Sequence, residues 1–99
     1  MAASIFKDKV VVITGASSGI GRELAYQLAE QGAWLSLAAR NGEQLATVAG
    51  ECQARGGKAI AIVTDVSKQA QCAELIQGTV KNYGRINMLE SVQHNVLAC

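Results

Sequence analysis

The chain has 99 residues, enough for one small domain with a single hydrophobic core, and its nine basic and eight acidic side chains leave a net charge of +1. This balance, without a run of basic residues, is not typical of proteins that bind nucleic acid or an anionic membrane. The first seven residues lack the apolar core of a signal peptide, and no apolar run approaches the ~20 residues of a membrane span. We therefore expect a cytoplasmic protein whose partner is a small molecule or another protein.

The first predicted element is a strand over Val10–Ile13, four β-branched apolar residues in a row, as in a strand buried on both faces of a parallel sheet. Three glycines follow, Gly15, Gly19 and Gly21, and a helix then runs to Gly32 with apolar residues at helical spacing. Such a turn directs backbone N–H groups and the positive end of a helix dipole at one point. The pattern therefore predicts a pyrophosphate site.

The spacing of these glycines, G-x-x-x-G-x-G, narrows the kind of site. It differs from the ordinary dinucleotide fingerprint G-x-G-x-x-G, and it lacks the Lys-Ser or Lys-Thr that closes a Walker A loop, which argues against a triphosphate site. Gly15 allows a backbone angle that other residues avoid. Gly19 and Gly21 remove Cβ atoms that would block a ligand or the packing of helix on strand.

Strand and helix then alternate along the chain. The predicted elements are a strand over Trp34–Ala39, a helix capped by Asn41 with Gln44 in a capping box, a strand over Ala59–Thr64, a helix capped by Ser67 that ends at Gly84, and a strand over Ile86–Leu89. The predicted inner faces of the last two helices are Leu45, Val48, Ala49 and Cys52, and then Ala73, Ile76, Val80 and Tyr83. This alternation predicts an α/β fold, a partial Rossmann-like, doubly wound parallel sheet with strand order 3-2-1-4.

The stretch Thr14–Gly21, Thr-Gly-Ala-Ser-Ser-Gly-Ile-Gly, resembles the cofactor motif of the short-chain dehydrogenase/reductase family, and the resemblance extends from about Lys9 to Leu89. It implies an oxidoreductase whose dinucleotide-binding Rossmann half is residues 1–89, followed by a divergent tail over 90–99. The cofactor-binding residues that it implies are Gly15, Ser17, Ser18, Gly19, Ile20, Gly21, Asp65 and Val66, the last two at the adenine. On the sequence alone, Asp65 could equally be a turn residue ahead of a helix cap.

Arg40 directs the choice of cofactor. The second predicted strand ends Ala38-Ala39-Arg40, so it offers no acid to accept hydrogen bonds from the ribose 2′-hydroxyl of NAD. The guanidinium instead suits a 2′-phosphate, and one charge-assisted contact of about 1.5–3 kcal/mol would favour NADP over NAD by roughly 10- to 100-fold. In the family, an arginine here is a mark of NADP-preferring members. The alternative is a solvated surface arginine.

No catalytic residue is assigned. In members of the family, a tyrosine that has a lysine four residues later donates the proton. Here the residue four positions after Tyr26 is Glu30, and the residue four positions after Tyr83 is Asn87. The three cysteines are widely spaced without a C-x-x-C pair, so no metal site is predicted.

Three interpretations remain open. The chain is a truncated, NADP-binding piece of an oxidoreductase that is inactive alone, a non-catalytic nucleotide-binding or dimerising regulatory module, or a non-functional truncated product. Whether it is an enzyme is therefore not decided by the sequence. In each case the fourth strand becomes an exposed apolar edge, through which the chain could self-associate.

Overall fold

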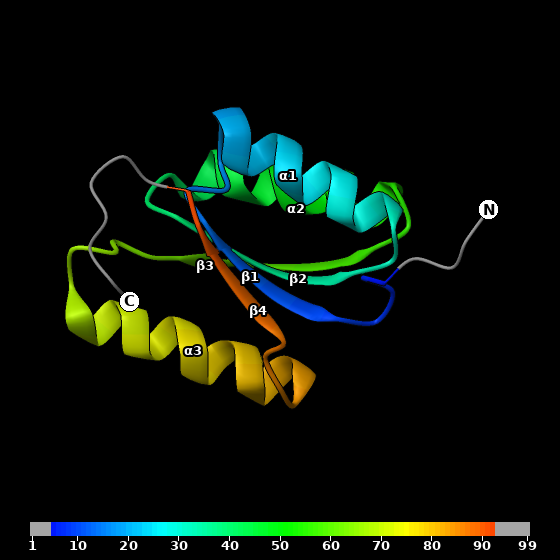
Figure 1. Ribbon diagram of the computed structural model, residues 1–99. Helices are drawn as coiled ribbons and strands as arrows, with labels where there is room; N and C mark the ends of the chain where they lie inside the picture. Colours follow the sequence, from blue (N-terminus) through cyan, green and yellow to red (C-terminus); the bar gives the residue numbers. More distant parts are fainter. Residues whose placement is uncertain (1–4, 93–99) are drawn as a thin grey trace.

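Strands and helices alternate throughout the computed structural model, which describes residues 5–92 (Figure 1). In chain order they are β1 (Val10–Thr14), α1 (Gly19–Glu30), β2 (Trp34–Ala39), α2 (Gly42–Ala54), β3 (Lys58–Val63), α3 (Gln69–Tyr83) and β4 (Met88–Ser91). All pairings between strands are parallel, and the order across the sheet is β3-β2-β1-β4. The predicted fold class and strand order are confirmed. From position 93 onward, the predicted tail lies outside the described residues.

The strand β1 is the centre of the sheet. It pairs with β2 on one side and β4 on the other, and all five of its residues are buried. Val11 and Ile13 belong to the core on one face, whereas Val12 belongs to the core on the other. An uninterrupted apolar strand is suited to this position, since both of its faces are covered.

Helices cover both faces of the sheet, as Figure 1 shows: α1 and α2 lie on one face and α3 lies on the other. The α1/α2 face holds a large cluster of fifteen buried residues, drawn mainly from β1, β2, α1 and α2. The α3 face holds a small cluster of Val12, Ala38 and Leu75, with Ile62 and Ile86 packed against it. The main core therefore lies between the sheet and the α1/α2 layer.

Local signals fixed most helix ends. The Asn41 side chain accepts a hydrogen bond from the Gln44 backbone N–H (3.0 Å), as an N-cap does. Gly32, just after α1, and Gly84, the C-cap of α3, both adopt the left-handed backbone that ends a helix. The predicted Ser67 cap is wrong. The Ser67 hydroxyl donates to Asp65 Oδ1 (2.6 Å) instead, and the N-cap residue of α3 is Lys68.

The inner face of α3 also differs from the prediction, by one position. Cys72, Leu75 and Thr79 are buried, whereas Ala73 is exposed and the side chain of Val80 is 44% exposed. Hydrogen bonds to β2 hold the helix in this rotation: the hydroxyl groups of Thr79 and Ser36 are hydrogen-bonded (2.7 Å), and Tyr83 Oη donates to the Leu35 carbonyl (2.9 Å). The apolar pattern alone missed the buried threonine because a threonine counts as polar.

The fourth strand begins two residues later than predicted. Asn87 precedes it and completes the pairing with β1, because its backbone N–H donates to the Val10 carbonyl (2.9 Å) and its side-chain Oδ1 accepts from the Val10 N–H (2.8 Å). Among residues 5–92, the strand β4 has β1 as its one neighbour in the sheet. Met88 is 36% exposed and Leu89 is 42% exposed, so this edge of the sheet is partly apolar, as expected.

Candidate functional site

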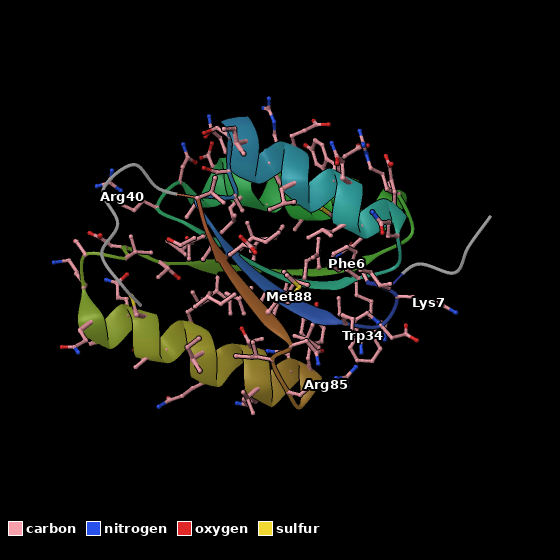
Figure 2. The ribbon with its side chains drawn as sticks, viewed as in Figure 1. Phe6, Lys7, Trp34, Arg40, Arg85 and Met88 are labelled. Atoms are coloured by element: carbon pink, nitrogen blue, oxygen red, sulfur yellow. The ribbon has the colours of Figure 1, made fainter. Side chains whose placement is uncertain are left out.

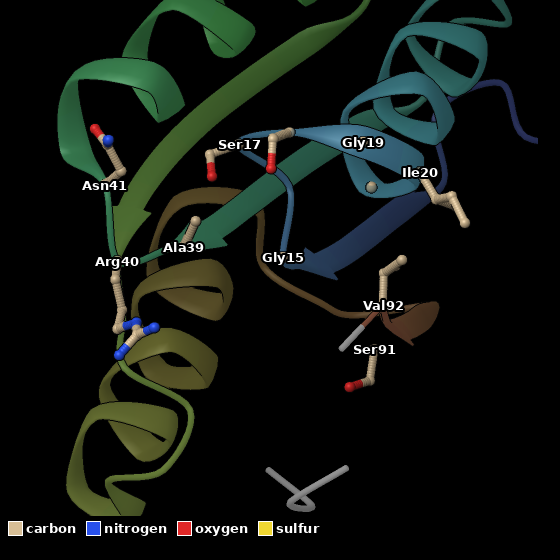
Figure 3. A pocket seen from close by; sticks show the side chains of 11 residues that line it. Gly15, Ser17, Gly19, Ile20, Ala39, Arg40, Asn41, Ser91 and Val92 are labelled. Atoms are coloured by element: carbon tan, nitrogen blue, oxygen red, sulfur yellow. The ribbon is translucent and has the colours of Figure 1, made fainter. Parts of the chain in front are cut away.

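A groove of about 750 Å³ lies at the carboxyl ends of β1, β2 and β4, beside the amino end of α1 (Figure 3). Its volume lies within the range of about 300–1,000 Å³ that is usual for small-molecule sites. Eleven residues line it: Gly15, Ser17, Ser18, Gly19, Ile20, Gly21, Ala39, Arg40, Asn41, Ser91 and Val92. Seven of the nine residues predicted to bind a cofactor are among them.

The glycine turn forms one wall of the groove, and its three glycines have different structural roles. Gly15 and Gly19 have positive φ angles of 65° and 59°. A Cβ on Gly21 would lie 2.1 Å from the Gly15 carbonyl oxygen, so this position lets α1 pack directly against the turn. A Cβ on Gly19 would meet no atom within 4 Å, so the space beside Gly19 is open to a ligand. The Ala16 N–H donates to the Ala38 carbonyl (3.1 Å) and ties the turn to β2.

The first turn of α1 offers backbone donors. Ser18 is the N-cap residue, with an extended backbone and a hydroxyl that makes no capping hydrogen bond. The Arg22 N–H reaches the Ser18 carbonyl (3.3 Å), whereas the N–H groups of Gly19 and Ile20 have no acceptor among residues 5–92. A bound anion would supply these acceptors, and the positive end of the helix dipole would favour it. The residues present therefore fit a phosphate group.

Arg40 follows the last residue of β2 and extends from it at the rim of the groove (Figure 3). Its side chain is exposed and has no carboxylate partner within 4.0 Å in the part of the chain that the structure describes. None of the eleven lining residues is acidic. A cation at the end of β2, with no acid lining the groove, favours an anionic group on the ligand.

Asp65 and Val66 are not among the lining residues. They follow β3, which lies one strand further than β2 from the glycine turn. Their role at an adenine stays a prediction. The Asp65 Oδ1 atom accepts hydrogen bonds from the Ser67 hydroxyl (2.6 Å) and backbone N–H (3.0 Å). These two bonds, with a smaller contribution from Arg40, lower the pKa of the Asp65 carboxyl below its usual value. Asp65 thus has the contacts of a turn residue.

Four lining residues were not predicted from the sequence: Ala39, Asn41, Ser91 and Val92. Ser91 and Val92 come from the end of β4, which the pairing with β1 places beside the glycine turn. The Thr14 hydroxyl donates to Ser91 Oγ (3.3 Å) and joins the two strand ends. The predicted strand order contained this signal, because neighbouring parallel strands end at the same edge of the sheet.

Neither tyrosine lines the groove. Tyr83 donates its hydroxyl to the Leu35 carbonyl, and burial raises the pKa of this phenol to about 12. The Tyr26 ring lies under the Arg55 guanidinium, whose central carbon is 4.3 Å from the ring centroid. Between residues 5 and 92 no three His, Cys, Asp or Glu side chains converge as metal ligands would. None of the helices described there is long and apolar enough to span a membrane.

Comparison with known proteins agrees with the fold. The family model for short chain dehydrogenase matches residues 9–95. An 11-beta-hydroxysteroid dehydrogenase-like 4A protein of Arabidopsis thaliana is 45% identical over 82 residues, which are 82% of this chain and 27% of the relative. An uncharacterized oxidoreductase of Listeria monocytogenes is 43% identical over 83 residues, 84% of this chain and 34% of the relative. The chain thus spans about a third or less of the length of these curated relatives.

A solved structure, a short chain dehydrogenase/reductase from Burkholderia phymatum in complex with NAD, superposes with a TM-score of 0.82 and 37% identity. The match covers 90% of this chain and 31% of that one. The glycine turn, the strand order 3-2-1-4 and the match over residues 9–95 lead to one conclusion. The chain belongs to the short-chain dehydrogenase family of oxidoreductases, which bind nicotinamide dinucleotide cofactors.

Proposed function

We propose that this chain is the NADP-binding part of a short-chain oxidoreductase, in which Arg40 binds the 2′-phosphate of the adenosine ribose. The observation that carries the proposal is the position of Arg40 at the rim of the groove, at the end of β2, with no acid among the lining residues. An acid at this strand end would accept hydrogen bonds from a 2′-hydroxyl and repel a 2′-phosphate. The Burkholderia phymatum structure contains NAD, so the cofactor preference needs a direct test.

Different parts of the groove would bind different parts of the cofactor. The N–H groups at the start of α1 would hold the pyrophosphate, and the open space beside Gly19 would admit it. The guanidinium of Arg40 would form charge-assisted hydrogen bonds with the 2′-phosphate. Ser91 and Val92, across the groove at the end of β4, would bound the cofactor on the far side. When bound, the nicotinamide would supply the hydride chemistry of the family.

The test is ligand binding measured by thermal unfolding with NADP⁺ and NAD⁺. Trp34, the only tryptophan, reports unfolding from the amino end of β2, away from the groove. We expect NADP⁺ to bind roughly 10- to 100-fold more tightly than NAD⁺, and a ligand at about 100 times its Kd adds ~2.7 kcal/mol to the free energy of unfolding.

Arg40→Gln should bring the two affinities within about threefold of each other, since it removes the charge-assisted contact. Lys68→Gln is the matched control, because Lys68 is an exposed cation near Asp65 that does not line the groove. It should leave the preference unchanged. Equal affinity of the unmodified chain for both cofactors would contradict the role of Arg40, and no stabilisation by either cofactor would contradict cofactor binding altogether.

We also propose that the chain alone does not catalyse carbonyl reduction. Both tyrosines make contacts away from the groove, and the raised pKa of Tyr83 makes its phenol a poor proton donor at neutral pH. With NADPH and a panel of ketones and aldehydes, oxidation of the cofactor should not exceed the background rate. Turnover that depends on Arg40 would overturn this proposal.

The exposed edge of β4 supports a second candidate role, as a module that self-associates. Leu89 is 42% exposed on a strand that has one neighbour among the four strands of the described region, and such an edge can pair with another chain. Sedimentation at increasing concentration should show association, and Leu89→Lys should shift it to higher concentration without loss of secondary structure. A chain that stays monomeric at all concentrations would exclude this role.

A further inference from the structure

The amino ends of the strands, opposite the groove, carry four cations, two of which lie over one aromatic ring. We call this surface the basic end and define it as Lys7, Lys9, Lys58, Arg85 and Trp34. Figure 2 shows Lys7, Trp34 and Arg85 at one end of the molecule and Arg40 at the other. The register of the sheet explains the grouping, because Lys58 pairs with Trp34, and the Trp34 N–H donates to the Lys9 carbonyl (2.8 Å).

The contacts of these cations leave their charge unneutralised. Lys58 Nζ lies 4.1 Å from the centroid of the Trp34 ring, and the central guanidinium carbon of Arg85 lies 5.0 Å from it. Arg85 also donates to the Asp8 backbone carbonyl and to the Asn87 side chain. Within residues 5–92, both ion pairs belong to Arg55, so no carboxylate approaches the four cations within 4.0 Å. An anion would therefore relieve the repulsion between them.

The charges of the whole chain are sorted between its two ends. In a parallel α/β fold the amino ends of the strands lie beside the carboxyl ends of the helices. The charged residues at this end of the molecule are Lys7, Asp8, Lys9, Glu30, Glu51, Arg55, Lys58, Lys81 and Arg85. Six of these nine are basic, whereas the remaining eight charged residues are three basic and five acidic. Although the net charge of the chain is close to zero, this end of the molecule is therefore positive, and it attracts an acidic partner at long range.

A hollow of about 300 Å³ opens beside these cations. It is lined by Ile5, Phe6, Lys9, Asn87 and Met88. Ile5 is 77% exposed and Met88 is 36% exposed, so apolar surface meets water here. A hollow accepts a side chain from a partner, whereas a membrane anchor needs side chains that protrude into the lipid.

We propose that the basic end binds an extended acidic segment of a partner protein, with one apolar side chain seated in the hollow. Four strand positions, from Lys58 through Trp34 and Lys9 to Asn87, cross the foot of the sheet. At ~4.8 Å between strands they span about 14 Å, which about five extended residues of ~3.3 Å each would cross. Carboxylates of the segment would meet the cations, and its apolar residue would meet Phe6 and Met88. This site is separate from the nucleotide groove, so the proposal stands or fails independently of Arg40.

The test titrates the chain with an acetylated, amidated peptide, Asp-Glu-Phe-Glu-Asp, and follows the fluorescence of Trp34. We expect saturable binding that weakens at least about tenfold when the salt is raised from about 50 to 500 mM, since charge drives the encounter. A peptide with Ala in place of Phe should bind at least about fivefold more weakly, because it leaves the hollow empty. The neutral peptide Asn-Gln-Phe-Gln-Asn should bind at least about tenfold more weakly.

The double variant Lys9→Gln with Lys58→Gln should weaken peptide binding at least about tenfold. The pair Arg22→Gln with Lys68→Gln removes the same charge from the opposite end and should change the affinity less than about twofold. If the first pair fails to fold by circular dichroism, Met88→Ala tests the hollow instead, with an expected loss of about fivefold. Equal weakening by both pairs would overturn the proposal. So would binding to phosphatidylserine vesicles without binding to the peptide, which would assign the surface to a membrane.

Discussion

The two faces of the sheet differ in how they are held together. Fifteen buried residues form the core on the α1/α2 face, whereas three form the core on the α3 face. The α1/α2 face also carries the glycine turn, because α1 begins there. The helix packs against the Gly15 backbone at Gly21, which has no side chain. The wall of the groove that carries the backbone donors is thus on the better packed face of the sheet, and the position of these donors depends on that packing.

The α3 face relies more on polar contacts. Thr79 and Tyr83 attach the helix to β2 by hydrogen bonds from their hydroxyl groups, and Val80 and Leu89 remain exposed beside it. A hydrogen bond of this kind adds about 1 kcal/mol net, less than the burial of a large apolar side chain. We therefore expect changes on the α1/α2 face to cost more than equivalent changes on the α3 face.

A glycine-to-alanine pair should show the largest contrast. Gly21→Ala in α1 places a Cβ against the Gly15 backbone, which cannot yield without moving the turn, so we expect a loss of about 4 kcal/mol or more. Gly78→Ala in α3 meets only the flexible end of Ile62, at 3.1 Å, and alanine favours a helix, so its effect should stay within about 1 kcal/mol. Urea unfolding followed by Trp34 fluorescence measures both changes. A Gly21→Ala chain as stable as the unmodified one would refute the tight packing of α1 on the turn.

Truncation of a buried leucine on each face gives the next contrast. Leu37 and Leu75 are both fully buried, in the large and the small cluster respectively. Leu37→Ala should cost about 3–4 kcal/mol, because the dense cluster around it cannot close the cavity. Leu75→Ala should cost about 2–3 kcal/mol, because the sparser α3 face can relax. Equal losses in the same urea experiment would show that the two faces do not differ in packing.

Alkaline pH should weaken the α1/α2 face by a smaller amount. Burial raises the pKa of the Cys52 thiol from 9.0 to about 11, because the thiolate is poorly solvated in the core. The neutral thiol therefore contributes its full stabilisation below about pH 9.0, and this contribution, about 3 kcal/mol at most, is lost as the pH rises through about 11. Cys52→Ala should remove this component of the alkaline loss of Tm. The raised pKa of Tyr83, about 12, acts at higher pH and should remain.

Patterns along the chain predicted most of the fold. Four β-branched residues in β1 and the alternation of strands and helices were enough for the fold class and the strand order, because a parallel sheet buries such strands and right-handed crossovers limit the topologies. Asn41 and Gly84 fixed helix ends because their side-chain or backbone chemistry acts locally. The rotation of α3 was missed by one position, since bonds to distant residues of β2 determine it.

In the same way, the sequence by itself determined the glycine turn and the cation at the end of β2, because each depends on a few adjacent residues. Only the tertiary structure brought Ser91 and Val92 to the groove, left Asp65 and Val66 outside its lining, and placed Lys58 and Arg85 over the Trp34 ring. These arrangements join residues up to about 80 positions apart, such as Thr14 and Ser91, and depend on which strands pair and in which register. The spacing of residues along the chain does not specify which strands pair, so these neighbours could be identified only from the folded structure.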